Sequence, residues 1–355
     1  MSGPILAFTQ GDPAGIGPEI LIKLLCGPGA SAGHRSLLVA ERAALAALRG
    51  ILPDAAWERL VDLDEVPDRA KLESLEPGSV AVLDPVGERR PIPFGRSGAA
   101  DARGALRALD LGMALARSGA VDALVTAPVS KESIARHERA DFRGHTEYLA
   151  EGCGLERYGR DYLMAFLAPD LQVALLTVHR PLREALDEIT PAAIADALGC
   201  LHRHTASRIA LAALNPHAGE GGLLGHEEDL ILDPGLAAAR SSGIDAHGPE
   251  SADSLFARAR RGEFDWVLAL YHDQGLIAVK TAAFGLATNW TLGLPFLRTS
   301  VDHGTAFSLA GRGRADERPL AAVVETTLKL ISKELPKKKN RSALPGPEMS
   351  GGAAA

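Results

Sequence analysis

Short apolar runs recur along the chain, and within each run apolar residues do not alternate with polar ones. A strand of this kind is buried on both faces, which is typical of a mainly parallel sheet covered by helices on each side. The pattern therefore indicates the α/β class. Strands are predicted at residues 5–9, 36–40, 79–83, 122–127, 162–168, 172–178, 208–214 and 266–271.

Between these runs, apolar residues recur three or four positions apart over residues 41–49, 99–119 and 190–204. Helices that pack on a sheet bury one such apolar stripe. The segment GDPAGIGPE, residues 11–19, follows the first predicted strand, and its Pro18 suits the first turn of a helix. We expect a strand, a glycine-rich turn and a helix to open the chain.

The length of 355 residues exceeds the size at which one hydrophobic core stops growing, so we expect two lobes. A net charge of −7 at pH 7 argues against nucleic acid as a partner. Three separated cysteines without a C-x-x-C pair favour a reducing compartment, and no apolar stretch is long enough to span a membrane. We therefore expect a cytoplasmic protein without a membrane partner. The Lys-, Pro- and Gly-rich residues 336–355 are predicted to be a disordered tail.

The glycine-rich turn at residues 11–19 does not match a dinucleotide fingerprint. Its glycines follow the spacing G-x-x-x-G-x-G, whereas the Rossmann turn requires G-x-G-x-x-G. A nicotinamide cofactor would therefore have to bind without the standard motif. A second cluster, Gly219, Gly221 and Gly222, either lets the backbone approach a ligand closely or merely turns the chain.

Three histidines stand where predicted strands pass into loops: His179, His217 and His272. Ligands of open α/β sheets bind at this edge, and neutral imidazole is the commonest side-chain metal ligand. Each histidine taken alone is more often a structural or capping residue. Three in equivalent positions make a shared divalent-metal site an equal alternative, and Asp273 beside His272 is available to orient an imidazole.

Polar residues near the end of the chain form a candidate anion cradle. A Lys, an Asn amide and an Arg that converged would bind phosphate or carboxylate, and Lys280, Asn289 and Arg298 stand among apolar and turn-forming residues. As separate residues they would be ordinary surface side chains. In the segment FRGHTEYLA, one interpretation of Thr146 is a helix N-cap. This interpretation does not explain His145.

Six motifs occur in order along the chain: GDPAGIGPEI, TAPVSKE, GHTEYLA, LNPHAGEGG, YHDQGL and TLGLPFLRTSVDHGTA. Together they resemble the family of 4-hydroxythreonine-4-phosphate dehydrogenase, called PdxA. The resemblance implies a two-domain, three-layer α/β/α fold similar to isocitrate and isopropylmalate dehydrogenases, with the active site in the interdomain cleft at a homodimer interface. The implied domains are residues 1–125 plus 285–335 and residues 126–284.

The resemblance also implies roles for individual residues. Ligands from both subunits would complete each metal site, and the metal ligands would be His179, His217 and His272. The substrate would be bound by His145, Thr146, Lys280, Asn289 and Arg298. The proton acceptor is not assigned, and the candidates are Asp253, Asp273 and Lys280. Candidate cofactor contacts are Gly219, Gly221 and Gly222.

In this family the reaction is an NAD- or NADP-dependent oxidation of 4-phosphooxy-L-threonine, assisted by one divalent ion such as Zn²⁺, Mg²⁺ or Co²⁺. Decarboxylation follows and yields 3-amino-2-oxopropyl phosphate, in pyridoxal phosphate (vitamin B6) biosynthesis. Relatives that oxidise 4-phosphorylated threonate or erythronate, or an aromatic cis-dihydrodiol, share these motifs, so the substrate stays open. From the residues alone, a metal-dependent hydrolase or lyase of a small phosphorylated molecule is an alternative from another class.

Overall fold

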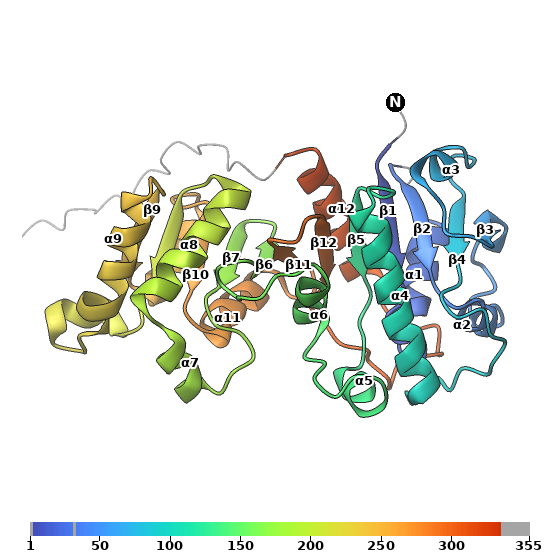
Figure 1. The fold of residues 1–355 in the computed structure, drawn as a ribbon, viewed down its shortest axis with the longest axis horizontal. Coiled ribbons are helices and arrows are strands. Elements are labelled where there is room, and N and C mark those ends of the chain that lie inside the picture. Colours follow the sequence, from blue (N-terminus) through green and yellow to red (C-terminus); the bar gives the residue numbers. More distant parts are fainter. Residues whose placement is uncertain (1–2, 31–32, 335–355) are drawn as a thin grey trace, which may run out of the picture.

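The predicted strands belong to one continuous sheet, which runs along the length of the molecule (Figure 1). The computed structural model describes residues 3–30 and 33–334, so the predicted tail at 336–355 lies outside the described residues. Within them the sheet has twelve strands in the order β3-β4-β2-β1-β5-β12-β11-β6-β7-β10-β8-β9. The strands are β1 (Ile5–Thr9), β2 (Arg35–Val39), β3 (Leu60–Leu63), β4 (Val80–Leu83), β5 (Ala123–Thr126), β6 (Leu163–Ala168), β7 (Leu171–Leu175), β8 (Ile209–Ala212), β9 (Ala246–Glu250), β10 (Trp266–Ala269), β11 (Thr288–Leu292) and β12 (Leu297–Val301).

The sheet consists of two parallel halves that run in opposite directions. One half comprises β3, β4, β2, β1, β5 and β12. The other half comprises β7, β10, β8 and β9. The reversal takes place at β11 and β6, which pair antiparallel with each other and with their outer neighbours β12 and β7. The prediction of a mainly parallel sheet is confirmed. The antiparallel strands at the centre of the sheet were not predicted.

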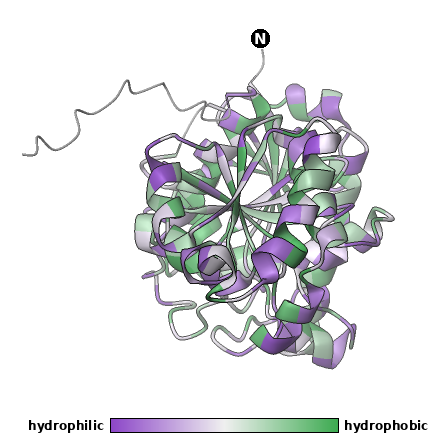
Figure 2. Ribbon diagram, turned by 90° about the vertical axis from the view of Figure 1, so that its left-hand side faces the viewer, coloured by the Kyte–Doolittle hydropathy of each residue, from purple (hydrophilic) through white to green (hydrophobic). Residues whose placement is uncertain are grey.

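Helices cover both faces of the sheet, and Figure 2 shows the strands fanned through the centre between the helical layers. The alternation of side chains along each strand supplies a core on either face. In β1, for example, Leu6 and Phe8 join one core while Ile5 and Ala7 join another. The α/β class is therefore confirmed, with helices packed against both faces of the sheet.

The helices have the following bounds among the described residues: α1 (Gly17–Cys26), α2 (Arg42–Leu48), η1 (Trp57–Arg59), α3 (Arg69–Glu73), α4 (Ala99–Arg117), α5 (Lys131–His137), α6 (His145–Gly152), α7 (Leu182–Glu188), α8 (Pro191–Thr205), η2 (Pro216–Gly222), η3 (Glu228–Leu232), α9 (Asp233–Ser241), α10 (Ala252–Arg260), α11 (His272–Ala283) and α12 (Arg318–Ile331). The predicted helices correspond to α2, α4 and α8, and α1 opens with Pro18 in its first turn as expected. Within the described part of the chain, no helix is both long enough and apolar enough to cross a membrane.

The apolar pattern does not predict β11 and β12, because polar residues interrupt both strands. These residues nevertheless lie inside the protein: Thr299 in β12 is buried and its hydroxyl is 2.7 Å from that of Thr327 in α12. The two strands link the halves into one sheet, so a division into residues 1–125 plus 285–335 and residues 126–284 stays a prediction.

The packing of α11 on the sheet depends on Gly275. A Cβ atom at this position would lie 2.6 Å from Leu175 Cδ2 and 3.0 Å from Val173 Cγ1 in β7. We predict that Gly275→Ala lowers the free energy of unfolding by roughly 1–3 kcal/mol, because the methyl group must push the helix off the strand. Urea denaturation measures the change.

Gly199 in α8 provides a matched control, because a Cβ there meets only Arg203 Nη1 at 3.6 Å. Gly199→Ala should leave stability unchanged or raise it by up to about 1 kcal/mol through the loss of unfolded-state freedom. Equal effects of the two substitutions would contradict the packing argument.

Candidate active site

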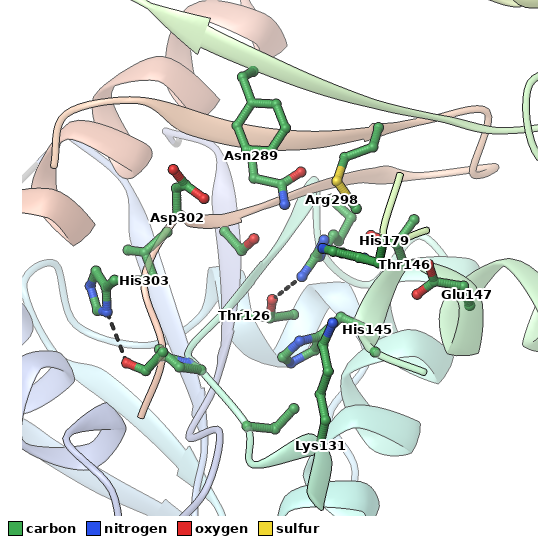
Figure 3. A pocket seen from close by; sticks show the side chains of 18 of the residues that line it. Thr126, Lys131, His145, Thr146, Glu147, His179, Asn289, Arg298, Asp302 and His303 are labelled. Atoms are coloured by element: carbon green, nitrogen blue, oxygen red, sulfur yellow. Dashed lines mark hydrogen bonds between the residues drawn. The ribbon is translucent and has the colours of Figure 1, made fainter. Parts of the chain in front are cut away.

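A cavity of about 390 Å³ lies at the antiparallel centre of the sheet. Side chains reach it from β5, β6, β11 and β12, from the first residues of α5, α6 and α11, and from the loop after β7 (Figure 3). All five residues predicted to bind substrate line this cavity, together with two of the three predicted metal ligands. These residues are His145, Thr146, His179, His272, Lys280, Asn289 and Arg298.

Arg298 lies in β12 with only 1% of its surface exposed. Its Nη1 donates to Thr291 Oγ1 at 3.0 Å and its Nη2 donates to Thr126 Oγ1 at 2.7 Å, whereas Nε has no partner among the described residues. Burial lowers the pKa of this guanidinium to about 9, against the opposing effect of Glu147. The side chain is therefore cationic at neutral pH, and no carboxylate of the described residues forms an ion pair with it. A buried cation without a counter-ion marks a place for an anionic ligand.

His145 and Thr146 open helix α6. The N-cap is Gly144 and no side chain caps the helix, so the interpretation of Thr146 as an N-cap is wrong. Its hydroxyl instead lies 3.4 Å from that of Thr291, which also binds Arg298. His145 Nε2 is buried without a partner, and burial, together with Arg298 and Lys131, holds the pKa of this imidazole well below its usual value. A neutral imidazole and the amides of a helix start thus stand beside the buried guanidinium.

Two further polar groups extend this arrangement. Lys280 Nζ in α11 lies 3.2 Å from Asp302 Oδ2, just past the end of β12. Asn289 in β11 has a buried Oδ1 without a hydrogen-bond partner, so its amide is ready to contact a ligand. Lys280, Asn289 and Arg298, the residues of the predicted cradle, therefore line one cavity.

The rings of His179 and His272 lie with their centroids 5.5 Å apart. Asp273 Oδ1 is 2.7 Å from His272 Nδ1, which leaves Nε2 of this ring for a ligand. Burial, the charge of Lys131 and the neighbouring His272 lower the pKa of His179, against the effect of Glu147, and this favours the neutral form that binds metals. Two imidazoles on one wall of the cavity are side chains of the kind that bind divalent metals.

His217 does not line the cavity, and nowhere in residues 3–30 and 33–334 do three His, Cys, Asp or Glu side chains form a group that could hold a metal. In the sheet, β8, which precedes His217, lies two strands from β7, which precedes His179, with β10 between them. His217 is exposed on η2, where the backbone is left-handed from residue 217 to residue 221. Three of these five residues are not glycine, and each costs roughly 1 kcal/mol in this conformation.

Glu228 holds this strained loop in place. One carboxylate oxygen accepts the backbone N–H groups of Leu214 and Asn215 at 2.9 and 2.7 Å, and the other accepts the Asn215 side-chain amide at 2.8 Å. The candidate cofactor contacts, Gly219, Gly221 and Gly222, supply left-handed positions in this turn. The buried carboxylate of Glu228 thus fixes the chain at the start of the strained turn that carries His217.

Two of the three candidate proton acceptors lie outside the cavity. Asp253 and Asp273 line a groove between α10 and α11, and Asp253 accepts a hydrogen bond from Ser251 Oγ at 2.8 Å. Lys280 alone of the three lines the cavity.

A family model described as pyridoxal phosphate biosynthetic protein PdxA matches residues 32–327. The chain belongs to the PdxA family. A 4-hydroxythreonine-4-phosphate dehydrogenase of Chromobacterium violaceum is 41% identical over 328 residues, which cover 90% of this chain and 95% of that protein. A D-threonate 4-phosphate dehydrogenase of Cupriavidus necator is 36% identical and covers 93% of this chain and 98% of its own length.

Solved structures of PdxA proteins share the fold. The crystal structure of 4-hydroxythreonine-4-phosphate dehydrogenase from Klebsiella pneumoniae superposes with a TM-score of 0.81 at 35% identity, and the match covers 93% of this chain and 98% of the other. The family predicted from the six motifs is therefore confirmed.

Two further residues of the PdxA motifs line the cavity, although the sequence did not single them out as candidates. Lys131, from TAPVSKE, is the first residue of α5, and Glu147, from GHTEYLA, lies in the first turn of α6. Both sit in sequences that look like ordinary charged helix starts. One signal in the sequence pointed to Lys131: it closely follows the predicted strand at 122–127, and ligands of α/β sheets bind at such strand ends.

For the PdxA cavity we predict that Arg298→Met stabilises the protein and destroys its affinity for anions. Because burial lowers the folded-state pKa below its ordinary value, the charge costs stability below about pH 9, and this cost falls as the pH rises above it. An apolar replacement removes the cost, so the free energy of unfolding at pH 7 should rise by roughly 1–3 kcal/mol.

Thermal unfolding with and without inorganic phosphate measures both effects. Phosphate should raise the Tm of the wild type and leave that of the variant unchanged. A variant that is less stable than the wild type would mean that the hydrogen bonds to Thr126 and Thr291 outweigh the desolvation of the charge.

Proposed function

We propose that this protein oxidises 4-phosphooxy-L-threonine with NAD or NADP and decarboxylates the product to 3-amino-2-oxopropyl phosphate, a step of pyridoxal phosphate biosynthesis in the cytoplasm. The observation that carries the proposal is the buried, carboxylate-free Arg298 at the centre of the cavity. A doubly charged phosphate group supplies the missing counter-charge. The names of the Chromobacterium violaceum and Cupriavidus necator relatives, both dehydrogenases of phosphorylated compounds, support the choice of reaction.

The residues of the chain would act mainly by positioning. Arg298, Lys131 and the amides at the start of α6 bind the phosphate and carboxylate groups, and Asn289 fixes the orientation of the molecule between them. Lys280, held by Asp302, presents a further ammonium group to the developing negative charge. With both ends of the substrate held, the carbon that loses hydride keeps one position in the cavity.

We propose further that each metal site is shared between two subunits. His179 and His272 come from one subunit, and His217 of the partner subunit completes the set. Large apolar side chains that are exposed in the single chain border both half-sites, which supports contact between two copies. They include Leu223 and Leu230, 81% and 71% exposed beside the His217 loop, and Leu182, exposed on α7 beside His179.

When bound, the divalent ion supplies Lewis acidity and the nicotinamide supplies the hydride acceptor. The ion would be Zn²⁺, Mg²⁺ or Co²⁺. The cavity has room for a small phosphorylated molecule but not for a whole dinucleotide, so most of the cofactor would lie outside it. Gly219, Gly221 and Gly222 remain the candidates for contact with it.

Mixed dimers test the shared metal site. Neither His217→Ala nor His272→Ala should be active alone, but in a heterodimer of the two variants one cavity keeps His179, His272 and the partner's His217. Random association should therefore restore about a quarter of the wild-type activity. His217→Ala and Glu220→Gln, an exposed position of the same loop, form the matched pair, and the second should remain active. A mixture without restored activity would show that the three ligands belong to one chain.

The formation of NADH at 340 nm tests the reaction. With 4-phosphooxy-L-threonine we expect stoichiometric NADH and carbon dioxide, whereas a hydrolase or lyase would release product without NADH. The Cupriavidus necator relative makes a 4-phosphorylated threonate the second candidate substrate. A clear preference for that compound over 4-phosphooxy-L-threonine would overturn the proposed substrate but not the reaction class.

A further inference from the structure

Three buried threonine hydroxyls are connected to the guanidinium of Arg298. Arg298 donates to Thr126 Oγ1 at 2.7 Å (Figure 3) and to Thr291 Oγ1 at 3.0 Å. The hydroxyl of Thr291 in turn lies 3.4 Å from that of Thr146. Thr126 and Thr146 line the cavity, whereas Thr291 does not. Thr291 therefore connects two residues of the cavity wall without facing a ligand itself.

The hydroxyl of Thr291 is not required by packing. Thr291 lies in β11 two positions after Asn289, so the two side chains project from the same face of the sheet. With 1% of its surface exposed, this position would suit a valine, which has nearly the same shape and an equal preference for strands. A valine would, however, leave one N–H of the buried guanidinium without its acceptor. The hydroxyl thus serves hydrogen bonding.

The chemistry of the guanidinium sets the direction of these hydrogen bonds. A guanidinium has donors and no acceptor, so the hydroxyls of Thr126 and Thr291 must accept from Arg298. Each of them then keeps one hydrogen to donate. Among the side chains of the described residues, Thr146 is the other hydrogen-bond partner of Thr291, so Thr291 donates to it. The distance of 3.4 Å makes this bond weak, but it leaves the hydrogen of Thr146 for another acceptor.

We infer that Thr291 is a positioning residue, which transmits the orienting effect of Arg298 to Thr146 so that the Thr146 hydroxyl donates to a ligand oxygen. Thr126, which also accepts from Arg298, keeps its hydrogen for the ligand in the same way. The wall beside Arg298 thus offers donors, and an ionised phosphate or carboxylate, whose free oxygens accept, is the group that fits. The inference rests on the proposed function, which places an anionic group of the substrate at Arg298.

The test uses two substitutions at one position and a matched control. Thr291→Val keeps the shape and removes the hydroxyl, whereas Thr291→Ser keeps the hydroxyl. Thr299→Val is the control, because Thr299 follows Arg298 in β12, is equally buried and bonds Thr327 at 2.7 Å instead. The probes are inorganic phosphate, followed by thermal unfolding, and 4-phosphooxy-L-threonine with NAD and a divalent ion at saturation.

We expect Thr291→Val to weaken phosphate binding roughly 5- to 30-fold, measured from the dependence of Tm on phosphate concentration. KM for 4-phosphooxy-L-threonine should rise by a similar factor and kcat should change by less than about threefold, because the hydride-losing carbon is not touched. Thr291→Ser should stay within about threefold of the wild type. Thr299→Val loses a buried hydrogen bond as well, so its Tm should fall while its phosphate affinity stays that of the wild type.

A double substitution tests the connection to Thr146. Thr146→Val should weaken phosphate binding by itself. If Thr291 acts through Thr146, the loss in the double variant falls short of the product of the two single losses. A loss equal to that product would show that the two hydroxyls act independently and would overturn the inference.

The other outcomes separate this inference from the proposed function. Equal effects of Thr291→Val and Thr299→Val on phosphate affinity, or no recovery in Thr291→Ser, would overturn the positioning role. Tighter phosphate binding by Thr291→Val would overturn it too, because Thr291 would then compete with the ligand for the guanidinium. A wild type that binds phosphate but forms no NADH would overturn the proposed function, and the phosphate affinities would still decide the inference.

Discussion

The desolvated charge of Arg298 is the constraint on which the site depends. A guanidinium that is 1% exposed and lacks a carboxylate is tolerated only where hydroxyl groups and a ligand replace water. The hydroxyls come from Thr126 at the end of β5 and Thr291 in β11, two strands on either side of β12. The sheet reverses direction between β12 and β11, and the cavity opens at this reversal. The centre of the sheet thus holds a buried positive charge that an anionic ligand would neutralise.

The sequence was sufficient for much of the fold, because apolar runs buried on both faces identify central parallel strands. It could not identify β11 and β12, whose buried residues include Thr299 and Arg298. Hydrophobicity cannot distinguish such strands from loops, since buried polar residues and exposed polar residues give the same sequence pattern. The same limitation applies to Lys131 and Glu147. The sequence does not distinguish a charged residue at a helix start that faces water from one that faces a cavity.

The histidines illustrate a second limit. Spacing placed His179, His217 and His272 at equivalent strand ends, and two of them do meet. The local pattern of apolar residues does not determine the order of strands in a sheet, so the sequence could not reveal that β10 separates β8 from β7. The strained loop that carries His217 is held by Glu228, a residue that no spacing rule would select. The backbone strain that keeps the His217 imidazole exposed suits a ligand for a metal held by a neighbouring molecule.

Three helices begin at the wall of the cavity: α5 with Lys131, α6 with His145 and α11 with His272. The peptide dipoles of each helix add up to a partial positive charge at its first turn. Three helix starts that border one small volume add a positive contribution from the main chain to its electrostatic potential. The backbone therefore supplies part of the attraction for anions, and the buried charge of Arg298 supplies the part on which binding depends.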